Sequence, residues 1–157
     1  QEVLRSDSTS LFNHRCSRLG DLMLARCQAV PKRPGAGWLD LPDALKPKNL
    51  VRHGDDRYAN RFGRLHWSGT FNTILTEAHP YWGRVIHPDQ DRVISVRESA
   101  RAQGFKDAVR FYGPLSSCYQ QVGNAVPPPL GEALGREILR AAGVVTSKHS
   151  AVALWDD

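Results

Sequence analysis

The sequence has few cysteines and no long run of apolar residues. Its 157 residues include three cysteines, Cys16, Cys27 and Cys118, which are too few and too scattered for a disulfide framework and fit a reducing compartment. No apolar run approaches the roughly 20 residues that a membrane-spanning helix needs. These absences argue against a disulfide-stapled secreted domain and against a membrane protein, so we expect no membrane partner.

An excess of negative charge is also lacking. The chain has 21 Lys and Arg against 16 Asp and Glu, which gives a formal net charge of +5. Arginine supplies most of the positive charge, and its planar guanidinium suits phosphates and base edges. Nucleic acid is therefore the first partner to test, although a mildly basic solvated surface explains the same composition. With 41% hydrophobic residues, a chain of this length can bury a core.

Hydrophobic spacing and capping signals predict three helices. Apolar residues on helical spacing predict a short helix over 21–29. Ser95 and Glu98 form a capping-box pattern, which predicts a helix over 96–103. Prolines precede a predicted helix over 130–142, in which apolar residues recur every four positions. The apolar stripe of this last helix must be buried against something.

The rest of the chain predicts short strands and irregular loops. Four runs with β character, at 64–67, 71–76, 84–86 and 92–94, predict a small antiparallel or mixed sheet. Proline and glycine are dense over 30–48, which predicts a packed irregular loop. The polar stretch 49–60 has turn chemistry at Gly54-Asp55 and is the best candidate for a boundary. Together these elements predict the α+β class, with a small irregular sheet region, a linking helix and a C-terminal helix.

Two long strings in the C-terminal half resemble a known family. The string Gln121-Val122-Gly123-Asn124-Ala125-Val126-Pro127-Pro128-Pro129-Leu130 resembles the last motif of the DNA cytosine-5 methyltransferases, and residues 92–105 resemble the motif before it. The strings stand in the family's order. Three upstream stretches are similar to the maintenance-type eukaryotic branch of the family: residues 34–42, 63–67 and 87–92. The resemblance covers about residues 19 to 143.

The resemblance implies a cofactor, S-adenosyl-L-methionine, and residues that lie against it. It places Gly123, Asn124 and Val126 in the cofactor pocket, with the glycine permitting close backbone approach. It also implies that the helix over 130–142 packs on an S-adenosylmethionine-dependent methyltransferase α/β domain that is missing from this chain. On spacing alone, the same string is a tight turn followed by a rigid helix start.

The resemblance assigns two further sets of residues. The helix that begins after Ser95 would link the target-recognition region to the catalytic domain through three charged residues: Arg97, Glu98 and Arg101. Phosphate contacts to DNA are plausible for three residues near strand ends: Thr73, Thr76 and Arg84. A solvated helix face is the alternative for the first set, and β propensity with surface solubility is the alternative for the second.

The chain departs from the family where the chemistry is concentrated. A cytosine-5 methyltransferase needs a low-pKa cysteine, in this family preceded by proline, but no Pro-Cys pair occurs here. The glycine-rich methyl-donor turn and the Glu-Asn-Val triplet are also absent. The histidines and cysteines lack paired metal-ligand spacing, so we expect no catalytic residue and no metal site in this chain.

These observations predict a C-terminal piece of a larger enzyme. The parent would transfer a methyl group from S-adenosyl-L-methionine to C5 of cytosine, in hemimethylated CpG DNA in the nucleus. We expect four segments: a poorly ordered segment 1–20, a remnant of the target-recognition region over 21–94, the last motifs and closing helix over 95–143, and a disordered tail over 144–157. The alternative is a non-catalytic DNA- or protein-binding module from a truncated or degenerate methyltransferase gene.

Overall fold

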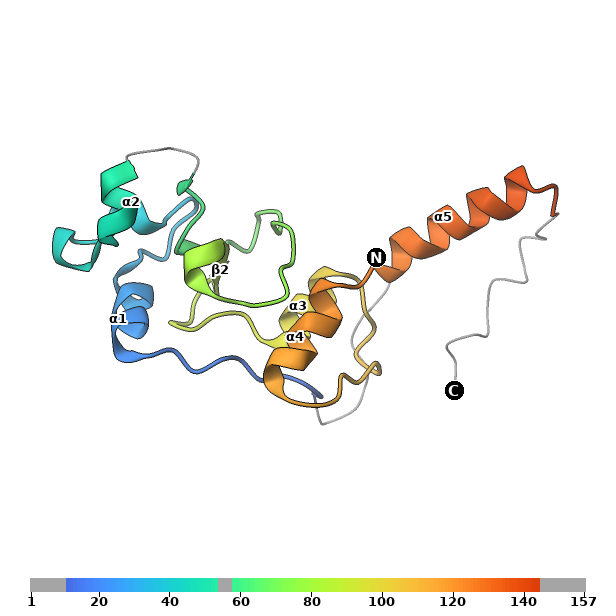
Figure 1. Cartoon of the computed structure of the whole chain (residues 1–157), viewed down its shortest axis with the longest axis horizontal. Coiled ribbons are helices and arrows are strands. Elements are labelled where there is room, and N and C mark those ends of the chain that lie inside the picture. The colour runs from blue at the N-terminus through green and yellow to red at the C-terminus, as the bar shows by residue number, and fades with distance from the viewer. Residues whose placement is uncertain (1–10, 54–57, 145–157) are drawn as a thin grey trace. The chain divides into compact units, whose positions relative to one another are not determined.

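The computed structural model describes residues 11–53 and 58–144 (Figure 1). Its regular elements, in chain order, are α1 (Asp21–Ala29), α2 (Lys48–His53), β1 (Gly63–Arg64), β2 (Arg84–Ile86), α3 (Val96–Ala102), α4 (Leu115–Gly123) and α5 (Pro128–Ala141). The chain divides into two compact units, Gln1–Ala125 and Val126–Asp157. Within the described part, none of the helices has the length and apolar character that a membrane crossing requires. The expected Gly54-Asp55 turn and the tail beyond residue 144 lie outside the described residues.

Local signals predicted α1, α3 and α5 closely. The Ser95 hydroxyl accepts the Glu98 amide at 3.1 Å, and the Glu98 carboxylate accepts the Ser95 amide at 2.6 Å, so the capping box is confirmed. Gly104, at φ +84°, ends the α3 region, and the Phe105 amide donates back to the Ala100 carbonyl at 3.0 Å. The face of α1 is less well predicted, because Leu22 is 53% exposed while Cys27 is buried.

Two helices were not predicted. α2 lies in the polar stretch that we expected to be a boundary, and α4 fills the region before the Gly-Asn string. Gly123 is therefore the last residue of α4 and Asn124 is its C-cap, rather than a turn that leads directly into α5. Val122 and Tyr119 are buried along α4, and tertiary packing of this kind stabilises a helix that has weak end signals.

The sheet is smaller than predicted, but it is mixed, which is one of the two predicted arrangements, and β2 occupies the predicted run 84–86. β1 and β2 pair in parallel, with Gly63 opposite Arg84, and one antiparallel bridge joins Ile86 to Val93. The run 71–76 is not a strand, so that part of the prediction is wrong. Its apolar residues pack singly against neighbouring segments: Ile74 is partly buried on a core, whereas Leu75 is 41% exposed. β propensity reports fit to a half-buried pleated surface, which is not available here.

Two apolar cores hold the first unit together. One lies on α3 and α4, which pack against each other, and its buried members are Leu65, Ala78, Val93, Ile94, Val96, Ala100, Phe111, Cys118, Tyr119 and Val122. The other lies beneath α1 and α2, and its buried members are Cys27, Val30, Ala36, Trp38, Leu41, Leu50, Phe62 and Ile86. Trp38 and Leu41 come from the Pro- and Gly-rich segment, so the predicted packing there is confirmed. The segment is not irregular throughout, because it contains two short 3-10 helices, Trp38–Asp40 and Asp43–Leu45.

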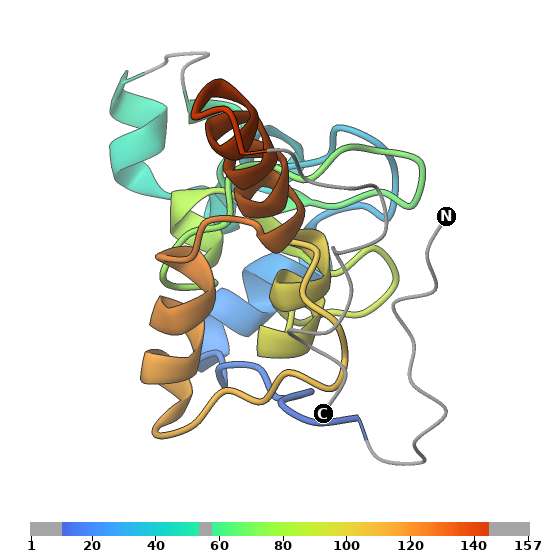
Figure 2. The same cartoon turned by 90° about the vertical axis from the view of Figure 1, so that its right-hand side faces the viewer.

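Residues 11–20, which we expected to be poorly ordered, lie against the start of α3. The Val96 amide donates to the Arg15 carbonyl at 3.0 Å, and the Arg97 amide donates to the Asn13 carbonyl at 3.1 Å. These bonds satisfy amides in the first turn of α3 that have no partner inside the helix. Figure 2 shows the blue segment after residue 10 running beside α3 and α4. Long-range pairing therefore orders a segment that has little pattern of its own.

Candidate cofactor and DNA-contact site

Gly123 lies against the backbone of a segment far away in the sequence. A Cβ atom at Gly123 would stand 2.6 Å from the Leu75 carbonyl carbon and 2.6 Å from the Thr76 nitrogen. Real side chains do not make contacts this short with backbone atoms, so α4 and the 75–76 peptide can meet only at a glycine. The close approach that we expected toward a cofactor is thus made, within this chain, toward its own backbone.

Asn124 follows as the exposed C-cap of α4. The Gln103 side chain donates to the Val122 carbonyl at 2.9 Å and to the Ala125 carbonyl at 3.4 Å, which fixes the turn around Asn124. Among the described residues the Asn124 side-chain amide has no hydrogen-bond partner. Val126 begins the second unit and is 61% exposed. A fixed backbone with a free amide is an arrangement that can hold a polar ligand.

Two of the three candidate DNA-contact residues line one shallow hollow. Thr73 and Arg84 lie in its wall together with Ser99 of α3, and Thr73 is exposed. Arg84 donates to the Asn60 side chain at 3.1 Å. Thr76 is exposed but does not line the hollow; its backbone nitrogen lies against Gly123. The fold therefore brings the segment 73–76 next to the end of α4, which the sequence did not indicate.

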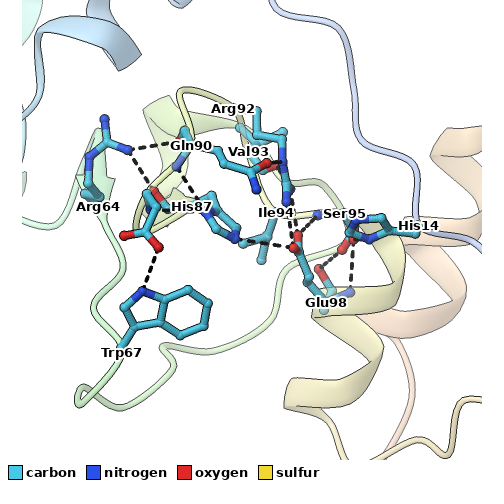
Figure 3. A network of polar contacts seen from close by, with 12 residues as sticks. His14, Arg64, Trp67, His87, Gln90, Arg92, Val93, Ile94, Ser95 and Glu98 are labelled. Atoms are coloured by element: carbon cyan, nitrogen blue, oxygen red, sulfur yellow. Dashed lines mark hydrogen bonds and ion pairs between the residues drawn. The ribbon is translucent and has the colours of Figure 1, made fainter. Parts of the chain in front are cut away.

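The start of α3 is the centre of a polar network (Figure 3). Arg92 donates to both carboxylate oxygens of Glu98, each at 2.7 Å, in the bidentate geometry that gives strong ion pairs. The Ser95 hydroxyl lies 3.0 Å from His14 Nδ1, which joins the N-terminal segment to the same cap. Burial by itself would raise the pKa of Glu98, but hydrogen bonds from Arg92 and the Ser95 amide outweigh it and lower this pKa to about 2.

His87 lies beside this network with a defined hydrogen-bonding role. Its Nδ1 accepts the amides of Asp89 and Gln90, both at 3.1 Å, so the proton of the neutral ring is on Nε2, 3.6 Å from the Glu98 carboxylate. Burial and the nearby Arg92 lower the pKa of His87. The Trp67 ring packs edge-on against His87, and its indole donates to Asp89 at 2.9 Å. His87 therefore stabilises the turn after β2 as a neutral acceptor.

Acid is expected to weaken the fold through Glu98. Its folded pKa of about 2 lies below its ordinary value of 4.5, so its contribution is present above pH 4.5 and is lost as the pH falls toward 2. The free energy of unfolding, measured in urea, should be about 2–3 kcal/mol higher for the wild type than for Glu98→Gln near neutral pH. This difference between the two proteins should shrink as the pH is lowered. Glu132→Gln, which removes an exposed α5 carboxylate, is the control. A gap that does not change with pH would contradict the assignment.

Arg97 and Arg101 both lie beside the buried carboxylate of Asp107. Arg101 donates to both oxygens of Asp107, at 2.9 and 2.6 Å, and Arg97 lies 4.0 Å from the same group. Arg97 is fully buried and donates to the carbonyls of Phe12 and Lys106, at 2.9 and 3.0 Å, and to that of Val109. These bonds join α3 to the segments before it and after it, within the first unit.

Sequence reasoning missed Arg64, which is the most extensively bonded side chain of the structure's described part. Its guanidinium is 1% exposed and donates to the carbonyls of Cys27, Val30, His87 and Gln90 and to the Asp91 carboxylate at 2.9 Å. The first two carbonyls lie at the C-terminus of α1, where a cation is also favoured by the helix dipole. Arg64 stands in one of the stretches that resemble the family, but its burial is not visible from neighbouring residues.

The three cysteines differ in accessibility. Burial raises the pKa of the Cys27 thiol to about 11, and Cys118 is also buried, whereas Cys16 is partly exposed. We expect a thiol reagent at mildly alkaline pH to modify Cys16 in the native chain and to reach Cys27 and Cys118 only on unfolding. Mass-spectrometric mapping of the labelled residues checks this, and rapid labelling of Cys27 under native conditions would contradict it.

In the described residues, no group of three His, Cys, Asp or Glu side chains is placed to hold a metal ion.

Comparison with known proteins agrees with the sequence strings. A family model described as C-5 cytosine-specific DNA methylase matches residues 18–140. DNA (cytosine-5)-methyltransferase 3 of Arabidopsis thaliana is 44% identical over 156 residues, covering 90% of this chain and 11% of that protein. DNA (cytosine-5)-methyltransferase 1A of Oryza sativa subsp. japonica is 42% identical over 158 residues, with 90% and 10% covered. DNA (cytosine-5)-methyltransferase 1 of Mus musculus is 34% identical over 183 residues, with 82% and 11% covered.

The match spans most of the described chain, from before α1 into the last turn of α5. The chain therefore belongs to the C-5 cytosine-specific DNA methylase family, and the predicted family is confirmed. It spans about a tenth of the length of the curated relatives it matches.

Proposed function

We propose that this chain is part of a DNA cytosine-5 methyltransferase that transfers a methyl group from S-adenosyl-L-methionine to C5 of cytosine. The family match over residues 18–140 carries this proposal. In it, residues 21–94 belong to a shortened target-recognition region and residues 95–143 to the closing part of the catalytic domain. The substrate is CpG-containing duplex DNA, hemimethylated as in maintenance methylation, and the enzyme acts in the nucleus.

The end of α4 fits one wall of a cofactor pocket. Gln103 fixes the turn, and the exposed Asn124 amide is free of partners among the described residues. Asn124 would hydrogen-bond the cofactor and Val126 would contact it through its apolar side chain, while Gly123 keeps the turn against the 75–76 peptide. S-adenosyl-L-methionine, when bound, supplies the methyl group.

The DNA-facing lobe would be the segment that packs on this turn. Thr73 and Arg84 share one hollow and Thr76 adjoins Gly123, so hydroxyl and guanidinium groups could contact phosphates close to the cofactor wall. Arg97, Glu98 and Arg101 would keep α3 and its neighbours in place through their ion pairs. The nucleophilic cysteine would come from another part of the enzyme, because none of the three cysteines follows a proline and two are buried.

The exposed face of α5 fits the same proposal. Leu130, Leu134 and Ile138 are 50%, 53% and 68% exposed, and they lie on one side of the helix because they are four residues apart. A helix with such an apolar stripe needs a partner surface. The remainder of the catalytic domain would supply it.

A graft tests the proposal. We expect the 157-residue chain alone to incorporate no tritiated methyl group into hemimethylated DNA, and residues 18–140 grafted in place of the matching segment of the Arabidopsis relative to restore transfer. A folded graft without activity would favour the non-catalytic module.

In the graft, Asn124→Ala should weaken cofactor binding by about 1 kcal/mol through loss of a hydrogen bond. Gln120→Ala, which changes an exposed residue one turn earlier on α4, is the control. An unchanged dissociation constant for S-adenosyl-L-methionine in the Asn124→Ala graft would remove Asn124 from the site.

A further inference from the structure

Two exposed arginines line one groove of the first unit. The groove has a volume of about 230 Å³ and is lined by Phe12, Asn13, Arg15, Arg110, Phe111 and Tyr112. Arg15 and Arg110 are exposed, and neither is paired with a carboxylate among the described residues, whereas Arg64, Arg92 and Arg101 of the same unit are paired. Like charges that face one hollow repel each other, so an anion bound between them is favoured.

The groove is also aromatic and firmly built. The Arg110 guanidinium stacks 3.6 Å above the Phe12 ring, and Tyr112 is 71% exposed. The Asn13 side chain donates to the Phe111 carbonyl at 2.8 Å and accepts the Phe111 amide at 3.0 Å. These bonds leave no free backbone edge at Phe111, so a ligand would be recognised by side chains.

The exposed charged residues of the two segments that line the groove are basic. Residues 11–20 contain no acidic residue, and residues 104–127 contain one, Asp107. Asp107 is buried and its carboxylate is held by Arg101. Arg97 is a buried cation whose guanidinium carbon lies 5.7 Å from the centroid of the Phe111 ring. The groove therefore combines a positive potential with aromatic surface.

We propose that this groove binds an acidic peptide segment in which an aromatic or aliphatic side chain stands beside the acidic residues. The guanidinium groups of Arg15 and Arg110 bind the carboxylates, and the apolar side chain packs on the exposed Tyr112 ring beside Phe12. A DNA duplex fits less well, because its phosphates lie on a convex backbone and its bases are stacked inside. It could reach the arginines but would leave the aromatic rings uncovered.

Fluorescence anisotropy with the full 157-residue chain tests this site. The probe is a labelled peptide, Gly-Asp-Glu-Phe-Asp-Glu-Gly, and its neutral counterpart is Gly-Asn-Gln-Phe-Asn-Gln-Gly. We expect the acidic peptide to bind at least about tenfold more tightly than the neutral one, and the Arg15→Gln, Arg110→Gln double variant to remove this preference. Tyr112→Ala should also weaken binding of the acidic peptide, but this binding should still weaken with added salt because both arginines remain.

Arg18→Gln is the matched control, because it removes one exposed positive charge from the same unit outside the groove. Circular dichroism checks that every variant stays folded, as expected for exposed side chains. Equal binding of the two peptides, or equal loss in Arg18→Gln and the double variant, would overturn the proposal. Tighter binding of oligothymidylate or duplex DNA than of the acidic peptide, abolished by the double variant, would overturn it in favour of nucleic acid.

Discussion

Replacing Arg64 with methionine is expected to lower the free energy of unfolding by about 3–5 kcal/mol. The guanidinium is 1% exposed and ties together the end of α1, β1 and the 87–91 turn through carbonyls and the Asp91 carboxylate. Its loss leaves buried acceptors without donors, which costs more than the bonds themselves contribute. For a domain with ordinary marginal stability, this is a large part of the total. Urea unfolding followed by far-UV circular dichroism measures it.

Two comparisons separate this effect from a general effect of losing positive charge. Arg64→Lys keeps the charge but cannot reproduce the planar set of five donors, so it should still be destabilising by about 1–3 kcal/mol. Arg33→Met removes an arginine that pairs with Asp40 and is 58% exposed, and should change stability by about 0–1 kcal/mol. A free energy of unfolding for Arg64→Met within about 1 kcal/mol of the wild-type value would contradict the stabilising role of the buried Arg64 hydrogen bonds.

Gly123→Ala is expected to destabilise the first unit by about 1–3 kcal/mol. Alanine is favoured over glycine in a helix by about 1 kcal/mol, but the new Cβ would stand 2.6 Å from backbone atoms of Leu75 and Thr76. A peptide backbone cannot rotate away as a flexible side chain can, so the clash decides the sign. The segment 73–76 must shift, and the grafted enzyme should then show a higher KM for DNA as well.

Gly135→Ala isolates the opposing helix-propensity effect. Gly135 lies inside α5, and a Cβ there meets nothing within 4 Å, so the change should favour the helix by about 0.5–1 kcal/mol. Because α5 belongs to the other unit, the measurement is the helix content by circular dichroism rather than unfolding of the first unit. Equal stabilisation by Gly123→Ala and Gly135→Ala would show that no close approach exists at Gly123.

Much of the local structure could be predicted because its causes lie within a few residues. The Ser95 and Glu98 cap, the glycine that ends α3 and the prolines at the start of α5 all act over one turn of helix. The sheet could not be predicted in the same way. The β-rich run 71–76 has no strand to pair with, and the two short strands that do pair are parallel and come from 63–64 and 84–86, a pairing that sequence distance does not indicate.

The candidate site shows the same division. By itself, the sequence determined the family and the helices α1, α3 and α5, because motif strings, helical spacing, the α3 cap and the α5 prolines are contiguous and can be read directly from the chain. Only the tertiary structure decided three features. Gly123 contacts the backbone of the 75–76 peptide, the buried Arg64 guanidinium donates to five acceptor groups, and Arg15 and Arg110 line the same groove. Each of these depends on contacts between segments tens of residues apart, and such contacts follow from packing rather than from local spacing.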